Sequence, residues 1–244
     1  MKNRQPYNLS TLLIAWNVFN ALFSFVGCIR FGQSFFWILA HQGYEYSICI
    51  IEYNYGVAAY WLARFAVSKA WELGDTAFLI LRKRPITFLH VYHHLSVLLY
   101  TWASHYEGIG AGRWFTQMNY SVHAMMYSYY AAKAANIKVP RWIPMSITIA
   151  QICQMLTGIC ITISISKIKL YGIRPCTHSI ENLCFALAIY GSYFVLFAHF
   201  FWTAYVKKPL HSTEINLIDS LNRSCISEAN GTNIVKRRSG FRCQ

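Results

Sequence analysis

Six apolar runs, separated by shorter polar or basic segments, dominate the pattern of this chain. They cover residues 11–29, 57–81, 87–104, 114–132, 141–166 and 182–205. Each has roughly the length that a helix needs to cross the ~30 Å hydrocarbon core of a bilayer. The pattern therefore predicts an all-α polytopic membrane protein with six transmembrane helices.

The segments between and after these runs are predicted to be loops and a tail. Residues 31–56 are mixed, aromatic and interrupted by glycine, which indicates a loop that contains an interfacial helix. We expect one transmembrane domain over residues 1–206 and a flexible cytosolic tail over 207–244, where no apolar run occurs. The first apolar run is longer than the core of a cleaved signal peptide, so we expect it to remain as the first helix.

Composition supports the membrane class, and the charge pattern gives the orientation. Hydrophobic residues make up 55% of the chain and charged residues 13%, which excludes an ordinary soluble domain. The net charge of +13 would suggest nucleic acid in a soluble protein, but here the basic residues lie between apolar runs, so no nucleic-acid partner is expected. Fifteen of the 22 Lys and Arg residues fall on the side of both termini and five on the other, which predicts cytosolic termini.

Three histidines lie close together at the start of the third apolar run, in the stretch FLHVYHH of residues 88–94. Offsets of three and four place His90, His93 and His94 on one side of a helix. Ionisable residues inside a membrane are rare and usually mark a functional site. This cluster is therefore the first candidate for chemistry.

Polar residues on other predicted helices fall at a matching depth. The second run carries Lys69, Glu72 and Asp75, which a lipid-facing helix could hardly hold. On the fourth run, Asn119, His123, Met126, Tyr127 and Tyr130 form one stripe at helical spacing, which is polar except for Met126. The fifth run carries the polar residues Thr148, Gln151 and Gln154. Counted from the basic residue at each cytosolic end, His93, His123 and Gln151 lie roughly 14 to 15 Å deep. We expect these helices to face one another.

Basic residues at the cytosolic ends of the same helices suit an anionic ligand. They are Arg82, Lys83, Arg84, Lys138, Arg141, Lys207 and Lys208. Such residues bind phosphate well, although the same charges also serve topology. The predicted site has an apolar interior, polar groups at one depth and basic residues at its cytosolic opening. It would fit an amphiphile with an anionic head group, such as an acyl-CoA.

The histidines could act in three roles, as metal ligands, as a general base or as a nucleophile. Di-iron desaturases and hydroxylases also contain an HxxHH box, but they need two or three boxes, and this chain has one. A single metal on His90, His93, His94 and His123 is the metal alternative. A neutral imidazole can instead attack a thioester or act as a base, which is the interpretation we favour.

A six-helix transporter with a histidine proton relay would be expected to show repeated halves, and the sequence contains no internal repeat.

Several stretches together resemble the ELO family, the fatty-acid elongases of the endoplasmic reticulum. They are SKAWELGDTAF (68–78), LRK (81–83), FLHVYHH (88–94), MNYSVHAMMYSYY (118–130) and TIAQICQ (148–154). The resemblance extends from about residue 10 to residue 206, with the motifs in the same order. It implies helices that enclose an acyl tunnel and a location in the membrane of the endoplasmic reticulum.

The resemblance implies a 3-oxoacyl-CoA synthase, an acyltransferase that condenses an acyl-CoA with malonyl-CoA and releases carbon dioxide and CoA. In a ping-pong scheme His93 would carry the acyl group, and His123 would assist the malonyl-CoA half with Asn119 and Gln151 nearby. No bound cofactor is implied, and malonyl-CoA is a co-substrate. The other enzymes of the elongation cycle and a second copy of the chain are possible partners. The motif details look most like the subgroup that acts on saturated and monounsaturated chains of palmitate type.

The site residues expected from these arguments form two sets. The catalytic set is His93, His123, His90, His94 and Asn119. The substrate-binding set is Lys69, Glu72, Asp75, Arg82, Lys83, Tyr127, Tyr130, Gln151, Gln154 and Lys207.

Two features differ from the family pattern and one agrees with it. Family members usually have seven spans, so this chain is expected to lack the outer first helix. Its end, Gly240 to Gln244, carries no dilysine retrieval signal. Cys49 and Cys176 both fall in loops predicted to be lumenal, where the family carries cysteines at similar places, so we expect a disulfide between them.

Overall fold

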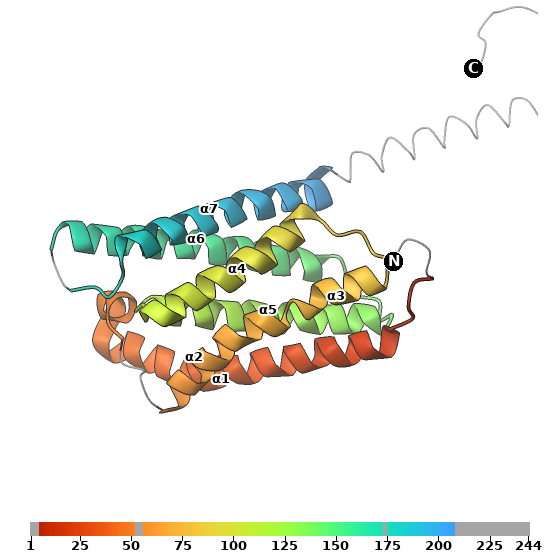
Figure 1. Ribbon diagram of the computed structural model, residues 1–244, viewed down its shortest axis with the longest axis horizontal. Helices are drawn as coiled ribbons and strands as arrows, with labels where there is room; N and C mark the ends of the chain where they lie inside the picture. Colours follow the sequence, from red (N-terminus) through yellow and green to blue (C-terminus); the bar gives the residue numbers. More distant parts are fainter. Residues whose placement is uncertain (1–4, 52–55, 173–174, 208–244) are drawn as a thin grey trace, which may run out of the picture. The chain divides into compact units, whose positions relative to one another are not determined.

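The computed structural model describes residues 5–51, 56–172 and 175–207, and every regular element in these ranges is a helix (Figure 1). The α-helices are α1 (Ser10–Cys49), α2 (Gly56–Trp71), α3 (Gly74–Leu81), α4 (Phe88–Glu107), α5 (Gly112–Ala134), α6 (Trp142–Leu170) and α7 (Ile180–Phe201). A short π-helix, η1 (Trp202–Lys207), follows α7. The predicted all-α class is confirmed.

Within the described residues, three helical segments are both long and apolar enough to span a membrane: Ser10–Cys49, Trp142–Leu170 and Ile180–Lys207. Helices α2 and α3 are too short, with 16 and 8 residues. Helices α4 and α5 have the length, but they carry the histidines and other polar side chains of the candidate site. The number of six spans therefore stays a prediction.

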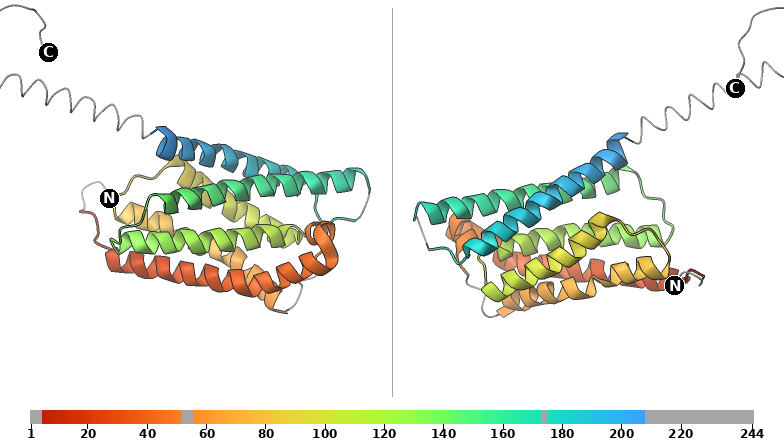
Figure 2. Two further views of the ribbon diagram at one scale, coloured as in Figure 1. Left: turned by 180° about the vertical axis from the view of Figure 1, so that it is seen from behind. Right: turned by 45° about the horizontal axis from the view of Figure 1, so that its top comes forward.

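The chain divides at His199 into two compact units. In the first unit α5 packs against both α1 and α6 and lies between them, while α2 packs against α1 and α4 (Figure 2). In the second unit, which begins at Phe200, the described residues are the end of α7 and η1, where Tyr205 contacts the rings of Phe200 and Phe201. The predicted domain over residues 1–206 extends past this division, because it includes the first residues of the second unit. Residues 208–244 of the predicted tail lie outside the described residues.

The loop predicted over residues 31–56 is wrong, because α1 continues through most of it to Cys49. Phe31, Phe35 and Ile38 are buried on this extension, so packing favours the helix despite the glycines. The helix bends at Gly43, whose φ of 82° is readily available only to glycine. After the bend, Ile48 and Cys49 at the end of α1 are fully buried.

The second apolar run is also not one helix. Helix α2 ends at Trp71 and α3 begins at Gly74, so the helix is interrupted at Glu72 and Leu73. A side chain at Gly74 would lie only 2.7 Å from the ring of Trp16 on α1. The interruption and this close packing leave the Glu72 side chain buried inside the bundle.

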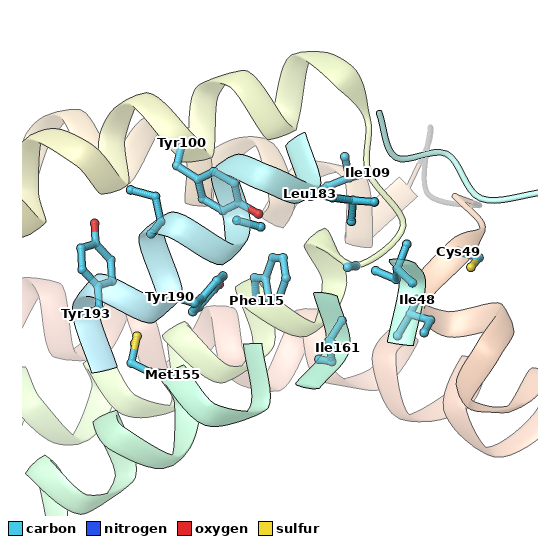
Figure 3. Packing of buried hydrophobic residues seen from close by; sticks show 14 of the residues in the cluster. Ile48, Cys49, Tyr100, Ile109, Phe115, Met155, Ile161, Leu183, Tyr190 and Tyr193 are labelled. Carbon is cyan, nitrogen blue, oxygen red and sulfur yellow. The ribbon is translucent and has the colours of Figure 1, made fainter. Parts of the chain in front are cut away.

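The largest buried cluster joins four helices and the end of α1. Tyr100 on α4, Phe115 on α5, Met155 on α6 and Tyr190 on α7 meet there (Figure 3). Apolar burial does not drive helix association in lipid, so close contact has to supply the stability. Gly158 on α6 provides it, because any side chain at that position would come within 2.5 Å of the Tyr190 ring.

One end of the bundle is closed by a covalent link between α1 and the segment before α7. Cys49 and Cys176 form a disulfide with their Cα atoms 4.3 Å apart, within the roughly 7 Å that a disulfide allows. Next to it, Thr177 donates to the Cys49 carbonyl through both its backbone N–H and its hydroxyl, at 3.2 and 3.0 Å. We call this the disulfide end.

Candidate active site

The histidine box forms a cluster of three rings near the start of α4. The helix begins at Phe88, and the Thr87 side chain caps it by accepting from the His90 backbone N–H at 3.3 Å. The rings of His90 and His94, one turn apart, have centroids separated by 4.3 Å, and the centroids of His93 and His94 are 5.5 Å apart. The expected clustering is therefore present.

The three imidazoles have different neighbours. His90 Nε2 lies 2.9 Å from the Thr76 hydroxyl on α3. His93 faces α7, where the ring centroid of Tyr193 lies 5.0 Å away. Tyr193 also donates from its hydroxyl to the His93 carbonyl at 3.2 Å. Helix α7 therefore supports the position of His93 through both its backbone and its ring.

A buried polar network connects α2 with α5. Lys69 and Glu72 are 2% and 4% exposed, and Lys69 Nζ donates to Glu72 Oε1 at 2.7 Å. Lys69 Nζ also donates to Asn119 Oδ1 at 2.8 Å. Glu72 Oε1 accepts from the Ser68 hydroxyl at 3.0 Å and lies 3.7 Å from His123 Nδ1. The structure thus places two expected binding residues against two expected catalytic ones.

This network lies beside the histidine box. Helix α2, which carries Lys69, packs against α4, which carries the box. Thr76 on α3, four positions after Glu72, lies 2.9 Å from His90 Nε2. The box and the network are therefore joined through α2 and α3.

Asp75 and Tyr127 form a second buried contact close to the first. Asp75 accepts from Trp16 Nε1 at 2.6 Å and from the Tyr127 hydroxyl at 2.7 Å. The Tyr127 ring lies 5.5 Å from the His123 ring and 6.3 Å from that of Tyr130, which is exposed. Asp75 is therefore held by two protein donors, one of them from α1.

The remaining binding candidates are spread more widely. Gln151 Nε2 contacts Met126 Sδ at 3.6 Å, which joins α6 to the polar stripe of α5, and Gln154 is buried one turn further along α6. Arg82 is half-buried and Lys83 exposed after the end of α3. Lys207 is exposed at the end of η1, in the second unit.

Metal binding gains no support from donor geometry. In the part of the chain that the structure describes, no three His, Cys, Asp or Glu side chains are arranged to hold a metal ion. The histidines of the box instead face Thr76, Tyr193 and one another.

A small cavity of about 50 Å³ lies further along α4, toward the disulfide end. Its lining includes Phe65 and Ala66 of α2, Tyr100 and Ser104 of α4 and Phe115 of α5. From His93 to Tyr100 is a rise of roughly 10 Å along a helix. The cavity is thus about two turns from the histidine box.

Sequence reasoning missed several residues that shape the site. Trp16 binds Asp75, and Tyr193 supports His93. Neither carried a signal, because each is one aromatic residue among many in an apolar run. Thr76, the partner of His90, could have been found, since it lies beside Asp75 in the polar segment of the second run.

Comparisons with known proteins agree with these observations. The model of the GNS1/SUR4 family (ELO) matches residues 1–213. Very long chain fatty acid elongase 6 of Drosophila melanogaster is 43% identical over 216 residues, which cover 87% of this chain and 68% of that protein. Elongase 6 of Mus musculus is 42% identical over 88% of this chain and 80% of its own length. Very long chain fatty acid elongase 3 of Homo sapiens is 42% identical over 85% and 76%.

Proposed function

Because the chain belongs to the GNS1/SUR4 (ELO) family, we propose that it is a fatty-acid elongase, an acyltransferase that condenses an acyl-CoA with malonyl-CoA. The products are a 3-oxoacyl-CoA, carbon dioxide and CoA. Relatives that are more than 40% identical to it over the aligned residues are named very long chain fatty acid elongases. The observation that carries the proposal is the buried site in which Asn119 contacts Lys69 and His123 lies 3.7 Å from Glu72, with the helix of the histidine box packed against α2.

His93 is the nucleophile in the first half-reaction. A nitrogen of its neutral imidazole attacks the thioester carbon of the acyl-CoA, so a C–N bond forms and the C–S bond breaks. CoA leaves as a thiolate and takes a proton from solvent, while the acylated ring gives its remaining N–H proton to a nearby base. A neutral acyl-imidazole remains on His93.

Malonyl-CoA reacts in the second half-reaction, which His123, Asn119 and Gln151 assist. Loss of carbon dioxide from the malonyl group leaves an enolate, whose negative oxygen needs a hydrogen-bond donor. The enolate carbon attacks the acyl carbon, so a C–C bond forms and the C–N bond to His93 breaks. The ring proton returns to His93, which is then ready for another acyl-CoA. No bound cofactor takes part.

The substrate is a saturated or monounsaturated acyl-CoA of palmitate type, as the motif details suggest. Its anionic CoA group is expected at basic residues such as Arg82, Lys83 and Lys207. The excess of Lys and Arg on the side of both termini supports cytosolic termini in the endoplasmic reticulum membrane. The other enzymes of the elongation cycle and a second copy of the chain are the expected partners there.

Purified protein with palmitoyl-CoA and labelled malonyl-CoA, with a chelator and no added metal, tests the proposal. We expect labelled 3-oxoacyl-CoA, and its loss in His93→Ala. His41→Ala is the control, because His41 is exposed on α1, where it contacts the carbonyl and the ring of Trp37. Full activity of His93→Ala would refute the nucleophile. Desaturated product that depends on iron, with no 3-oxoacyl-CoA, would refute the elongase.

A further inference from the structure

The buried pair Lys69 and Glu72 lies between two residues assigned to the reaction. Lys69 Nζ reaches both carboxylate oxygens of Glu72, at 2.7 and 3.1 Å, and also Asn119 Oδ1, at 2.8 Å. On the other side of the pair, Glu72 Oε1 is 3.7 Å from His123 Nδ1. The contacts therefore run from Asn119 through Lys69 and Glu72 to His123.

Lys69 determines which way the Asn119 amide faces. A lysine ammonium group has three donors and no acceptor, so only the oxygen of an amide can face it. The Nδ2 amine of Asn119 must then point away from Lys69. Asn119 consequently presents a hydrogen-bond donor to the site.

Glu72 determines the proton position on His123 in the same way. A carboxylate paired with an ammonium group, as Glu72 is with Lys69, can only accept. His123 Nδ1 lies 3.7 Å from Glu72 Oε1, beyond direct hydrogen-bond distance, and the negative charge there favours the tautomer in which Nδ1 carries the ring proton. In a neutral imidazole the other nitrogen, Nε2, is then an acceptor.

We propose that Lys69 and Glu72 are positioning residues that fix the polarity of this site, so that Asn119 presents a donor and His123 a proton acceptor. The inference rests on the proposed function, because the chemistry that uses this polarity is the condensation. Asn119 Nδ2 donates to the enolate oxygen. His123 Nε2 takes the ring proton of His93 during acylation, directly or through a water, and returns it when the C–N bond breaks.

The two half-reactions can be followed separately. Release of CoA from palmitoyl-CoA alone, with the acyl group located on the protein by intact mass, measures acylation of His93. Addition of malonyl-CoA to the isolated acyl-protein measures transfer. A wild-type protein that shows neither reaction would refute the proposed function. The variants described below test the positioning role in a wild type that shows both reactions.

Glu72→Gln tests the positioning of His123. A Gln side chain can still accept from Lys69 through its oxygen, but it is neutral, so no negative charge next to Nδ1 keeps the ring proton of His123 on that nitrogen. We expect CoA release to slow about 100-fold, as for loss of a general base. His123→Ala should cause a similar loss, and Glu72→Gln/His123→Ala should be no slower than His123→Ala.

This comparison separates positioning from a purely structural role. A structural role predicts that the two losses multiply in the double variant. Multiplied losses, or a Glu72→Gln rate within about threefold of wild type, would overturn the proposal. Glu107→Gln is the matched control, since Glu107 is a partly buried carboxylate that accepts from the Ser179 backbone N–H, at the disulfide end. Its CoA release should stay within about twofold of wild type.

Asn119→Asp tests the contact between Lys69 and Asn119. It is a separate variant, so its result does not depend on whether Glu72→Gln folds. It keeps an oxygen toward Lys69, with which it can form an ion pair, and replaces the Nδ2 amide group, a donor, by a second oxygen of the carboxylate. We expect transfer to malonyl-CoA to fall about 100-fold or more, the usual cost of losing an oxyanion donor. Transfer at the wild-type rate would show that only the oxygen of Asn119 matters and would overturn the assigned polarity.

Discussion

Removing the disulfide between Cys49 and Cys176 should destabilise the protein without abolishing its fold. The change is the double substitution Cys49→Ser/Cys176→Ser. Both Thr177 hydrogen bonds go to the backbone carbonyl of residue 49, so they survive the substitution. Gly110 also still donates to the Thr177 hydroxyl, at 3.1 Å. The folded position of the segment before α7 should therefore be kept, and the main effect should come from the unfolded chain.

The size of the effect follows from the length of chain that the disulfide closes. Its two cysteines are 127 positions apart, and the chain-entropy relation gives about 5 kcal/mol for a loop of this length. A membrane protein unfolded in detergent keeps part of its helical structure, so fewer backbone dihedral angles of the closed loop are free to rotate than the relation assumes. We therefore expect a loss of about 2 to 4 kcal/mol, which corresponds to a fall in Tm of roughly 5 to 15 °C.

Thermal unfolding in detergent, with and without reductant, measures this loss. Reductant should lower the Tm of the wild type toward that of the double variant and should leave the variant unchanged. A control in which Cys28 and Cys184 are replaced by Ser should respond to reductant like the wild type, because both are free thiols. Equal Tm values for wild type and double variant under oxidising conditions, or labelling of Cys49 by a maleimide without reductant, would refute the reasoning.

Three further predictions concern stability and use the same thermal assay. Gly110→Ala should lower Tm, since its new Cβ would lie 2.6 Å from backbone at the end of α1, at a cost of about 1–3 kcal/mol; Gly191→Ala, which has open space, should not lower it. Lys69→Met should lower the free energy of unfolding by about 3–5 kcal/mol, because it leaves the Glu72 carboxylate buried without its ammonium partner. Lys69→Met/Glu72→Gln should recover most of this loss, and a double variant less stable than Lys69→Met would contradict the prediction. Burial lowers the pKa of His178 from 6.5 to about 4, so the unfolded chain binds more protons between these values, and stability should fall by about 2 kcal/mol as pH decreases from about 7.5 to 5. His178→Phe should lack this part of the pH dependence, and an unchanged slope would contradict the assignment.

Much of the site could be located from the sequence because its residues sit in helices whose geometry is local. Offsets of three and four placed the histidines of α4 together, and the rise per residue placed His93 and His123 at one depth. The structure shows the rings of the three histidines clustered on α4. The motifs also identified the family, which the comparisons confirm.

The sequence could not predict how the polar residues pair. Lys69, Glu72 and Asp75 were expected to bind substrate, because charged side chains inside a membrane usually serve a ligand. The structure pairs Lys69 with Glu72 and Asn119, and Asp75 with Trp16. These partners are separated by up to 59 positions in the chain, so no local pattern indicates which of them will meet.

The sequence by itself determined that the chain is all-helical and belongs to a family of membrane proteins, and it singled out the residues expected to supply the chemistry. The physical reason is that backbone hydrogen bonds in lipid must be made within each segment, so composition and spacing decide where helices form. Only the tertiary structure decided that α1 continues through residues 31–49 and that Glu72 turns inward between α2 and α3. Those outcomes depend on non-local packing, such as Trp16 against Gly74, where glycine allows close contact. The tertiary structure therefore assigns Lys69 and Glu72 their place beside Asn119 and His123.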